Sequence, residues 1–448
     1  MRKKHSAVPF VWEAGEICYD EYRQVNRMRE KIHQWIRDHA EEIIALGDEL
    51  FVHPELGFKE FETGRILKEF MEKYQLKVER EYAVTGFSVS IGQGSPHIGI
   101  IAELDAIPTP KHPCADPISK AAHACGHSTQ QVIALAALCA IKENCRDLKG
   151  KITLFFTPAE EFTDLEYRKE LRKEGKIRYL SGKENMLYEH LLDDVDCILH
   201  FHAMGSSDCR FSVNSVLSGF TYKKITFEGR AAHAAAAPDR GINALNECTL
   251  FLNAVALLRE TFRDEDVVRV HGIIDEGGQT VNSIPDKVVY ECYVRSVNPD
   301  VVLDLNRKLS NAAECCAKAL GGSCIIEDTP GYLPLHQSKE LNEVVYENML
   351  YFTEAKNIKW NEISAAAGDV GDICMFKPII QYGYGGFTGR IHGEDLFVSD
   401  REEVYLVQSE LVADIVADLL SHPEKVKKIK ESFTPKMTYE EYLNYLNQ

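Results

Sequence analysis

Hydrophobic and polar residues follow two alternating patterns in the first part of this chain. Apolar residues at helical spacing predict helices over residues 20–50, 61–74 and 129–144, and continuous apolar runs predict buried strands over 85–91, 97–104 and 151–157. Because helices alternate with strands, we expect an α/β domain with a mostly parallel sheet. Ligands of such sheets bind at the carboxyl ends of the strands, where several carboxylates and imidazoles of this chain stand.

The pattern changes between residues 218 and 331. Predicted elements here are strands at 222–227, 267–274 and 287–294 and helices at 241–262 and 300–320. Their order is that of a βαββαβ, ferredoxin-like α+β domain. The chain then returns to the first arrangement and ends in a helix over 401–420. We therefore expect one domain formed by residues 1–217 and 332–448, with an inserted satellite domain of residues 218–331.

One charged stretch interrupts the first domain. Residues 165–190 are rich in Lys, Arg and Glu. We interpret this stretch as a solvated helical insertion, in preference to a substrate lid, because runs of charge are usually exposed.

Composition narrows the range of partners. The 448 residues include 51 Lys and Arg against 69 Asp and Glu, a net charge of −18. This balance disfavours nucleic acid and anionic membranes, and no apolar run approaches the roughly 20 residues that span a bilayer. The apolar stretch 7–12 is not expected to act as an export signal, and the 13 Cys form no regular framework. We therefore expect reduced thiols in a cytoplasmic protein.

The strongest chemical signal is a short turn ahead of an apolar helix, His123-Ala124-Cys125-Gly126-His127. Cys125 and His127 flank one Gly, so a thiolate and an imidazole can converge on one point. This pair suits Zn, Co, Ni or Mn better than Mg or Ca. A small buried Cys and a core His are the default alternatives, but their combination on one turn favours metal binding.

Two adjacent carboxylates, Glu160 and Glu161, follow the strand predicted at 151–157. Acidic residues also favour helix N-termini, which is the alternative explanation. The pair stands at a strand end, in register with the other polar residues, and this position favours two different catalytic roles for the carboxylates. One carboxylate would bind metal, and the other would act as general base toward the attacking water.

Three further histidines are candidates for metal ligands. His200 and His202 lie two residues apart on a predicted strand, so both side chains face the same side. One would be a ligand and the other a packing or supporting residue. For His392, in a Gly-rich loop near the C-terminus, an exposed loop histidine and a ligand are equally good interpretations.

Together these segments resemble the co-catalytic metallo-amidohydrolases and peptidases of the aminoacylase and carboxypeptidase type. Within that family the chain is similar to the subgroup of hippurate hydrolase, auxin-conjugate hydrolases and aminobenzoyl-glutamate hydrolase. The matching segments, in family order, are 53–57, 102–108, 123–127, 157–161, 229–235, 238–245 and 282–286. The resemblance covers most of residues 30–420, and several ordered motifs together are highly specific.

The resemblance implies a site with two divalent metal ions, Zn or Mn in the first place and Co or Ni as alternatives. The ligands would be Cys125, which would bridge the ions, His127, Glu161, His202 and His392, with His202 preferred over His200 by its spacing after Asp196. Glu160 would be the general base and proton shuttle. Asp105 and His200 would support the ligands. Ions about 3.5–4 Å apart would polarise the amide carbonyl and activate a shared water.

The resemblance also assigns roles to residues outside this group. The inserted domain would be a lid or dimerisation domain of a homodimer. His233 would reach a neighbouring active site, across the dimer or within the chain, and stabilise the oxyanion. Asn243 and Asn282 would hold substrate or lid, although Asn243 also suits a helix cap. Arg390 would bind a substrate carboxylate.

The implied activity is hydrolysis of the amide bond of N-acyl or N-aroyl amino acids. The alternatives are a dipeptidase or aminopeptidase with the same metal centre, and a non-catalytic binding protein that retains the fold. Three departures from the family bear on the substrate. Ser128 replaces an acidic or amide residue, Gly393-Glu394-Asp395 follow His392, and the loop 365–372 lacks its usual Ser or Thr.

Overall fold

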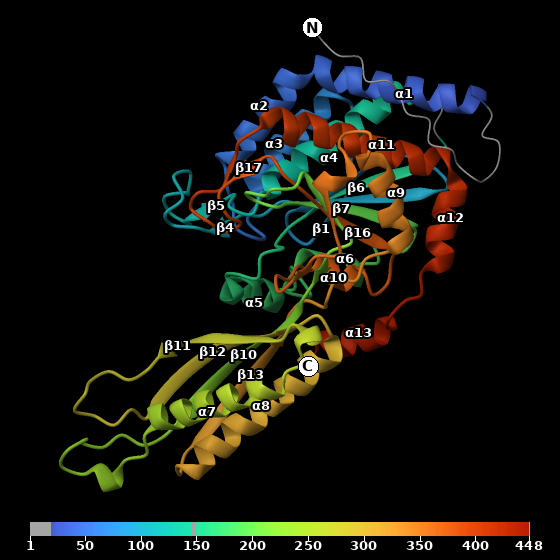
Figure 1. Cartoon of the computed structure of the whole chain (residues 1–448). Coiled ribbons are helices and arrows are strands. Elements are labelled where there is room, and N and C mark those ends of the chain that lie inside the picture. Colours follow the sequence, from blue (N-terminus) through green and yellow to red (C-terminus); the bar gives the residue numbers. More distant parts are fainter. Residues whose placement is uncertain (1–18, 146–148, 448) are drawn as a thin grey trace.

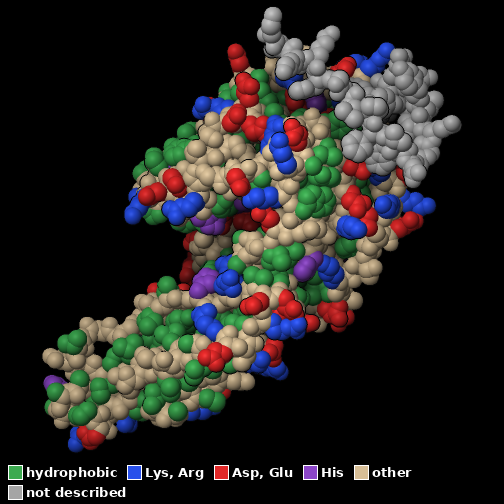
Figure 2. All heavy atoms as spheres, viewed as in Figure 1, with side chains coloured by type: hydrophobic (Ala, Val, Ile, Leu, Met, Phe, Trp, Pro, Cys, Tyr) green, Lys and Arg blue, Asp and Glu red, His purple; other side chains and the backbone are tan. Residues whose placement is uncertain are grey.

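The computed structural model describes residues 19–145 and 149–447, with side chains from residue 27 onward. Figure 1 shows a large body of sheet and helices and an elongated arm, residues 219–330, that extends from it. Figure 2 shows the surface hollowed between the body and the arm, with acidic and histidine side chains around the hollow.

The body is built on one eight-stranded sheet with the order β1-β2-β6-β3-β7-β16-β8-β14. The strands are β1 (Val78–Tyr82), β2 (Gly86–Gln93), β3 (His97–Glu103), β6 (Gly150–Thr157), β7 (Cys197–Ala203), β8 (Phe211–Val213), β14 (Ile358–Trp360) and β16 (Ile379–Tyr384). Pairing among β6, β3, β7 and β16 is parallel. β1 pairs antiparallel with β2, β2 with β6, and β8 with β16, whereas β14 pairs parallel with β8. The carboxyl ends of the four parallel strands therefore meet at one edge of the sheet.

Helices cover both faces of this sheet because successive residues of the central strands point to opposite sides. On β3, Ile100 packs into one apolar core and Ile101 into the other. The first core is covered by α1 (Tyr19–Asp38), α2 (Ala40–Phe51), α3 (Phe61–Lys73), α4 (His127–Asn144), α9 (Lys339–Met349), the π-helix η5 (Glu402–Val407), α11 (Gln408–Ser421) and α12 (Pro423–Ser432). The second is covered by α5 (Leu165–Lys173), α6 (Gly182–Tyr188), α10 (Val370–Ile373) and α13 (Tyr439–Leu446).

The arm contains its own four-stranded antiparallel sheet, with the order β11-β12-β10-β13. Its elements are β10 (Gly219–Glu228), α7 (Ala244–Leu258), β11 (Arg269–Glu276), β12 (Lys287–Ser296), α8 (Pro299–Ala319) and β13 (Ser323–Pro330). Both helices pack on the sheet around a third apolar core (Figure 1). The observed order is the βαββαβ order expected; that residues 218–331 form an inserted satellite domain stays a prediction.

Short elements complete the chain. They are β4 (Ile107–Pro108), β5 (Ala121–Ala122), β9 (Val216–Leu217), β15 (Ile363–Ser364), β17 (Phe387–Thr388) and β18 (Phe397–Val398), with 3₁₀ turns η1 (Pro238–Arg240), η2 (Arg259–Thr261), η3 (Asp264–Asp266) and η4 (Ala355–Asn357). Within the described ranges, no helix is both long and apolar enough to cross a membrane.

Two sequence predictions about helices need correction. The helix predicted over 20–50 is two helices, because the chain turns at His39, whose ring bonds back to the carbonyl of Trp35. The stretch 165–190 is solvated only in part. Arg168 on α5 is fully buried, and Gly182 to Leu187 of α6 are buried against the second core, so runs of charge did not imply exposure here.

Candidate metal centre

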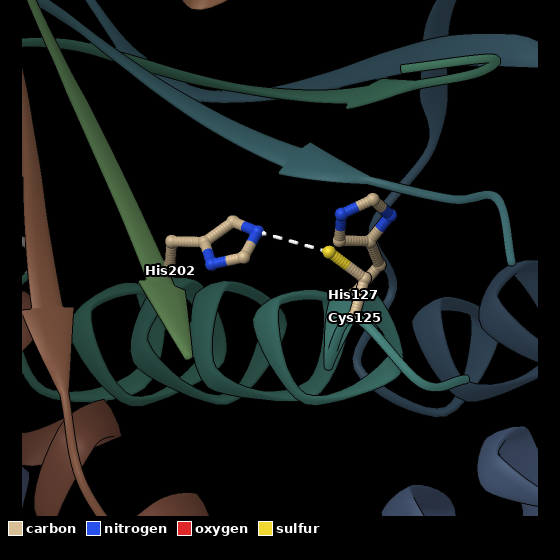
Figure 3. Close-up of side chains that lie close together, drawn as sticks. All are labelled: Cys125, His127 and His202. Atoms are coloured by element: carbon tan, nitrogen blue, oxygen red, sulfur yellow. Dashed lines mark hydrogen bonds between the residues drawn. The ribbon is translucent and has the colours of Figure 1, made fainter. Parts of the chain in front are cut away.

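The predicted ligands lie together at the carboxyl ends of the parallel strands. Cys125 comes from the turn between β5 and α4, His127 is the first residue of α4, and His202 comes from the end of β7. Figure 3 shows these three side chains close together, with Cys125 Sγ 3.4 Å from His202 Nε2. Glu161, after β6, meets His392, whose Nε2 lies 3.0 Å from Glu161 Oε1.

The position of Cys125 depends on Gly126. Gly126 has a φ of 84°, in the left-handed region that favours glycine. A Cβ atom at this position would lie 2.6 Å from the Cβ of Ala203 on β7. The turn can therefore approach β7, and bring Cys125 next to His202, only without a side chain at residue 126.

Two sets of three donors share the thiol of Cys125. One set joins Cys125 with His127 and His202, and the other joins Cys125 with Glu161 and His392. A third set joins Glu103, His127 and Glu160, and within each set the donor atoms lie within 4.8 Å of one another. Compact groups of thiol, imidazole and carboxylate donors fit a divalent transition metal.

Burial sets the protonation of the donors. It raises the pKa of the Cys125 thiol well above its ordinary value, and the charge of Glu161 raises it further. It also lowers the pKa of His202 to about 4, so that this ring is neutral near pH 7 and keeps a lone pair for a ligand bond. A bound cation would favour the thiolate, since metal ligation and loss of the proton are linked.

Side chains from distant segments hold the turn that carries Glu160 and Glu161. Ala159, just before them, has a φ of 55°, so the backbone here continues neither the strand nor a helix. The amide of Ala159 donates to the carboxylate of Glu60 at 2.9 Å, and the amide of Glu161 donates to that of Asp105 at 2.9 Å. The hydroxyl of Tyr332 donates to the carbonyl of Glu160.

The two adjacent carboxyls have different surroundings. Burial raises the pKa of Glu160 well above its ordinary value, and the charges of Glu103 and Glu161 raise it further. Burial also raises the pKa of Glu161, but the hydrogen bond and charge of His392 outweigh it and lower the pKa overall. Such a separation suits one proton-accepting carboxyl and one that stays ionised.

Comparison with known proteins identifies the family. The sequence matches peptidase family M20/M25/M40 over residues 99–418. The chain belongs to this family. Among its relatives, N-acetyl-L-cysteine deacetylase of Bacillus subtilis is 26% identical over 68% of this chain and 71% of that protein. Xaa-Arg dipeptidase of Homo sapiens is 24% identical over 91% and 92%, and a component of the p-aminobenzoyl-glutamate hydrolase of Escherichia coli is 27% identical over 68% and 62%.

Solved structures share the fold of this M20 protein. A putative aminohydrolase from methicillin-resistant Staphylococcus aureus superposes with a TM-score of 0.73 at 20% identity, covering 88% of this chain and 100% of that one. A dinuclear metal binding peptidase of the M20 family from Bacillus subtilis gives 0.66 at 19% identity, covering 86% and 99%. The predicted family, the α/β fold class and the expected class of enzyme, a hydrolase of amides, are therefore confirmed.

In this M20 hydrolase, Asp105 and His200 lie beneath the predicted ligands. Asp105 Oδ1 is 3.3 Å from His127 Nδ1, while its other oxygen accepts from the amide of Glu161. His200 Nε2 lies 3.2 Å from Glu103 Oε1, whereas His202 is the histidine next to the thiol. These contacts agree with the supporting roles expected for both residues, which stay predictions.

Four other predicted residues stand apart from the thiol. His233 and Asn282 lie in neighbouring loops of the arm, where the amide of Ala234 donates to the carbonyl of Asn282. The Asn243 side chain caps α7. Arg390 is exposed between β17 and β18. No contact within the described ranges joins the three arm residues to the predicted ligands.

Sequence reasoning missed a buried ion network under the site. Lys183 Nζ lies 2.6 Å from Glu103 Oε1 and also donates to the carboxylate of Asp369, and all three side chains are almost fully buried. Burial raises the pKa of Glu103, but Lys183, His200 and His127 outweigh it and lower the pKa well below its ordinary value. The signal available in the sequence was the capping-box pattern Ser181 to Glu184, which places a helix start here.

A second missed residue is Arg295 on β12. Its guanidinium lies 5.2 Å from the ring centroid of Phe220 and 5.0 Å from that of Tyr293. Phe220 in turn packs against Phe162, which directly follows the two adjacent carboxylates. Nη1 of Arg295 donates to the carbonyl of Ala365 at 3.2 Å, whereas its Nε has no partner and no carboxylate lies within ion-pairing distance in the described part of the chain, so the remaining donors can serve a bound anion.

Proposed function

We propose that this M20 hydrolase uses two divalent metal ions to remove the acyl or aroyl group from an N-acylated amino acid. The observation that carries the proposal is the sharing of Cys125 by two donor sets, beside the carboxylate of Glu160. The relatives named for N-acetyl-L-cysteine and p-aminobenzoyl-glutamate support the substrate class. The dinuclear metal binding peptidase of the same fold supports the number of ions.

In this proposal Cys125 would be shared by the two ions. His127 and His202 would complete one set of ligands, and Glu161 and His392 would complete the other. The donor set fits Zn or Mn, with Co or Ni as alternatives. When bound, the metals would supply Lewis acidity toward the amide carbonyl and the attacking water.

The residues of the chain then carry the proton. Glu160 takes a proton from the attacking water and delivers it to the nitrogen of the leaving amino acid. Its buried position, with an elevated pKa, favours a carboxyl that gains a proton during the reaction. Asp105 keeps His127 and the amide of Glu161 in place, so that the carboxyl of Glu160 meets the water in one orientation.

The carboxylate of the substrate needs a cation in this acidic protein. Arg295 is the first candidate, because its Nε has no partner in the described ranges and its guanidinium lies over Phe220, which packs against Phe162 directly after Glu161. Arg390, in the exposed loop of His392, is the second candidate. Asn282 is proposed to hold the substrate or the lid. Asn243 would have the same role in addition to capping the N-terminus of α7.

We propose further that the arm, as a satellite domain of residues 218–331, forms a homodimer. Figure 2 shows hydrophobic side chains gathered on the arm, and Leu250, Leu257, Ile273 and Ile274 are exposed there. Two of these belong to β11, an edge strand that can pair with a second chain. His233 of one protomer would then stabilise the oxyanion in the site of the other. A reducing, cytoplasmic location is proposed because none of the cysteines in the described ranges forms a disulfide.

The test combines metal content with hydrolysis. Purified protein, with and without added Mn or Zn, is assayed on N-acetyl and N-benzoyl amino acids, p-aminobenzoyl-glutamate and dipeptides, beside Glu160→Gln. We expect about two metals per chain and metal-dependent turnover of N-acyl amino acids. Glu160→Gln should keep the metal and lose turnover about 10²–10⁴-fold. Protein that binds no metal would refute the proposal, and metal without turnover of any substrate would favour a binding role.

A dipeptidase with the same centre is the second candidate. The relative named Xaa-Arg dipeptidase aligns over 91% of this chain, which is the observation in its favour. A free α-amine on the substrate distinguishes the two functions. Turnover of dipeptides that is faster than turnover of their N-acetylated forms would establish the dipeptidase.

A further inference from the structure

The helix α5 carries one buried arginine, Arg168, among mostly exposed charged residues. Its neighbours Lys169 and Arg172 are solvated, but the side chain of Arg168 is fully buried. The Arg168 guanidinium lies over the ring of Phe58, 5.5 Å from its centroid. Burying an arginine is costly unless its donors are satisfied, so the partners of this side chain are informative.

Those partners are backbone carbonyls, and two of the three belong to the turn that carries Glu160 and Glu161. Nη1 donates to the carbonyl of Ala159 at 3.3 Å and to that of Leu180 at 2.7 Å, and Nη2 donates to the carbonyl of Glu161. Within the described ranges, no carboxylate lies within ion-pairing distance of Arg168. The guanidinium therefore holds the carbonyls of Ala159 and Glu161, the residues on either side of Glu160, rather than neutralising an acid.

A glycine in a neighbouring segment leaves the space that this contact needs. A Cβ atom at Gly57 would lie 2.6 Å from Arg168 Nη2 and 2.8 Å from the Cα of Ala159. Gly57 thus lets Arg168 and the turn at Ala159 approach each other. The segment is tied to α5 a second time, because Lys59 Nζ lies 2.6 Å from the carboxylate of Asp164.

Arginine is required by the geometry of these contacts. Its planar fork presents donors in fixed directions, so one side chain can serve several carbonyls at once. A lysine has a single nitrogen on a flexible stem and cannot span the carbonyls of Ala159 and Glu161 in the same way. Tyr332 holds the carbonyl between them, so the three consecutive carbonyls of residues 159–161 all accept from side chains.

We propose that Arg168 is a positioning residue, through which α5 fixes the orientation of the Glu160 general base and the Glu161 ligand. This inference rests on the proposed function and deepens it. It gives a role in the reaction to the stretch 165–190, which the sequence predicted to be a solvated insertion. Arg168 touches neither substrate nor metal and acts only through the turn.

The expected effect is on metal affinity and kcat rather than on KM. Loss of an outer partner of a metal ligand typically costs 10–100-fold in metal affinity or activity. A shift of the general base by about 1 Å can cost about 10²-fold in rate. Because substrate would be held mainly by residues outside this turn, we expect KM to stay within about threefold of wild type.

The experiment compares Arg168→Met and Arg168→Lys with two matched controls on the same helix. Leu171→Ala weakens the packing of α5 against the second core but leaves the guanidinium in place. Arg172→Met removes an exposed arginine one turn away. Each variant is measured for Tm of the metal-free protein, for affinity and absorption spectrum in a titration with Co²⁺, and for kcat and KM.

We expect both Arg168 variants to lose about 10–100-fold in Co²⁺ affinity and kcat, with a changed Co²⁺ spectrum. Arg172→Met should match wild type, and Leu171→Ala should lower Tm while keeping kcat. The proposal is overturned if Arg168→Met lowers Tm alone, or if Leu171→Ala loses kcat equally at the same loss of Tm. If Arg168→Met does not fold, Arg168→Lys carries the test, because it keeps the charge and most of the volume.

The titration separates this inference from the proposed function. If wild type binds Co²⁺ but hydrolyses no substrate, the proposed function fails, and the affinities and spectra of the variants still decide the role of Arg168. If wild type is active and the Arg168 variants keep wild-type affinity and kcat, the inference alone fails.

Discussion

Replacing Lys183 by Met tests the buried ion network most directly. The ammonium of Lys183 lies between the carboxylates of Glu103 and Asp369, and none of the three side chains is exposed by more than 2%. Methionine keeps the approximate volume of the side chain and removes its charge. The substitution therefore leaves two buried carboxylates facing each other beneath the predicted metal ligands.

The expected loss of stability follows from the cost of breaking a buried ion pair. Removing one partner of such a pair typically costs about 3–5 kcal/mol, because the remaining charge is buried without compensation. The unfolding entropy of a body of about 300 residues is roughly 0.6 kcal/mol/K near 60 °C. A loss of about 4 kcal/mol therefore lowers Tm by about 6 °C.

The loss should grow as pH rises. In wild type the pKa of Glu103 is well below its ordinary value, so its pairing contributes stability above the unfolded pKa that is lost as pH falls. In the variant the two carboxyls lose their cation, and burial raises their folded pKa above the unfolded value. Stability of the variant is then lost as pH rises. Because the wild-type contribution is already complete above the unfolded pKa, it stays constant from about pH 5.5 to about pH 8, and the loss in the variant alone widens the difference over that range.

The assay is thermal unfolding of metal-free protein at both pH values, followed by calorimetry. Lys173→Met, which removes an exposed lysine from α5, is the control and should change Tm little. Adding Glu103→Gln to Lys183→Met should restore part of the stability at the higher pH. A loss that is independent of pH, or no larger than that of Lys173→Met, would refute the reasoning.

Three further outcomes are expected. Chelation of the metals should abolish hydrolysis and lower Tm, and re-addition at about 100 times Kd should restore about 2.7 kcal/mol; an unchanged Tm would count against a metal site. Glu247→Met should stabilise the arm by about 1–3 kcal/mol at pH 8, because the carboxylate of Glu247 is buried without a hydrogen-bond partner in the described ranges. The gain should be smaller at pH 5.5, because burial raises the pKa of Glu247 to about 7 and the folded protein loses this charge by protonation below that value. Thermal unfolding at both pH values checks the sign. Arg295→Ala should raise KM at least about tenfold for substrates with a free carboxylate and leave amidated analogues unaffected; equal effects on both would exclude carboxylate binding.

The sequence predicted the parts of the molecule that depend on local pattern. The apolar runs of β3 and β6 and the buried helix α4 stand where they were expected. The carboxyl ends of the parallel strands β6 and β7 bring Glu161 and His202 to one edge of the sheet, because strands that run in parallel end at one edge. Cys125 instead follows β5 of a separate two-stranded sheet, and it was recognised from its spacing to His127.

Residues whose role depends on distant partners could not be recognised in this way. Arg168 and Lys183 stand among other lysines and arginines, and residue type alone does not separate them from the exposed Arg172. Their burial is decided by carbonyls and carboxylates from other segments, above all Ala159, Glu103 and Asp369. Helical spacing gave one hint, since Arg168 shares a face of α5 with the buried Leu171.

The charges around Glu160 explain why cations gather beneath and within this site. Buried acids here are Glu60, Glu103, Asp105, Glu160, Glu161 and Asp369. Burial and the charge of Asp105 raise the pKa of Glu60 to about 8, which shows how unfavourable a further carboxylate is in this environment. Lys183 is the fully buried cation that α6 supplies from one side, whereas the buried Arg168 of α5 serves backbone carbonyls. Divalent metals would supply positive charge on the other, so the charged segment that looked like a solvated insertion and the metal centre offset the same excess of buried negative charge.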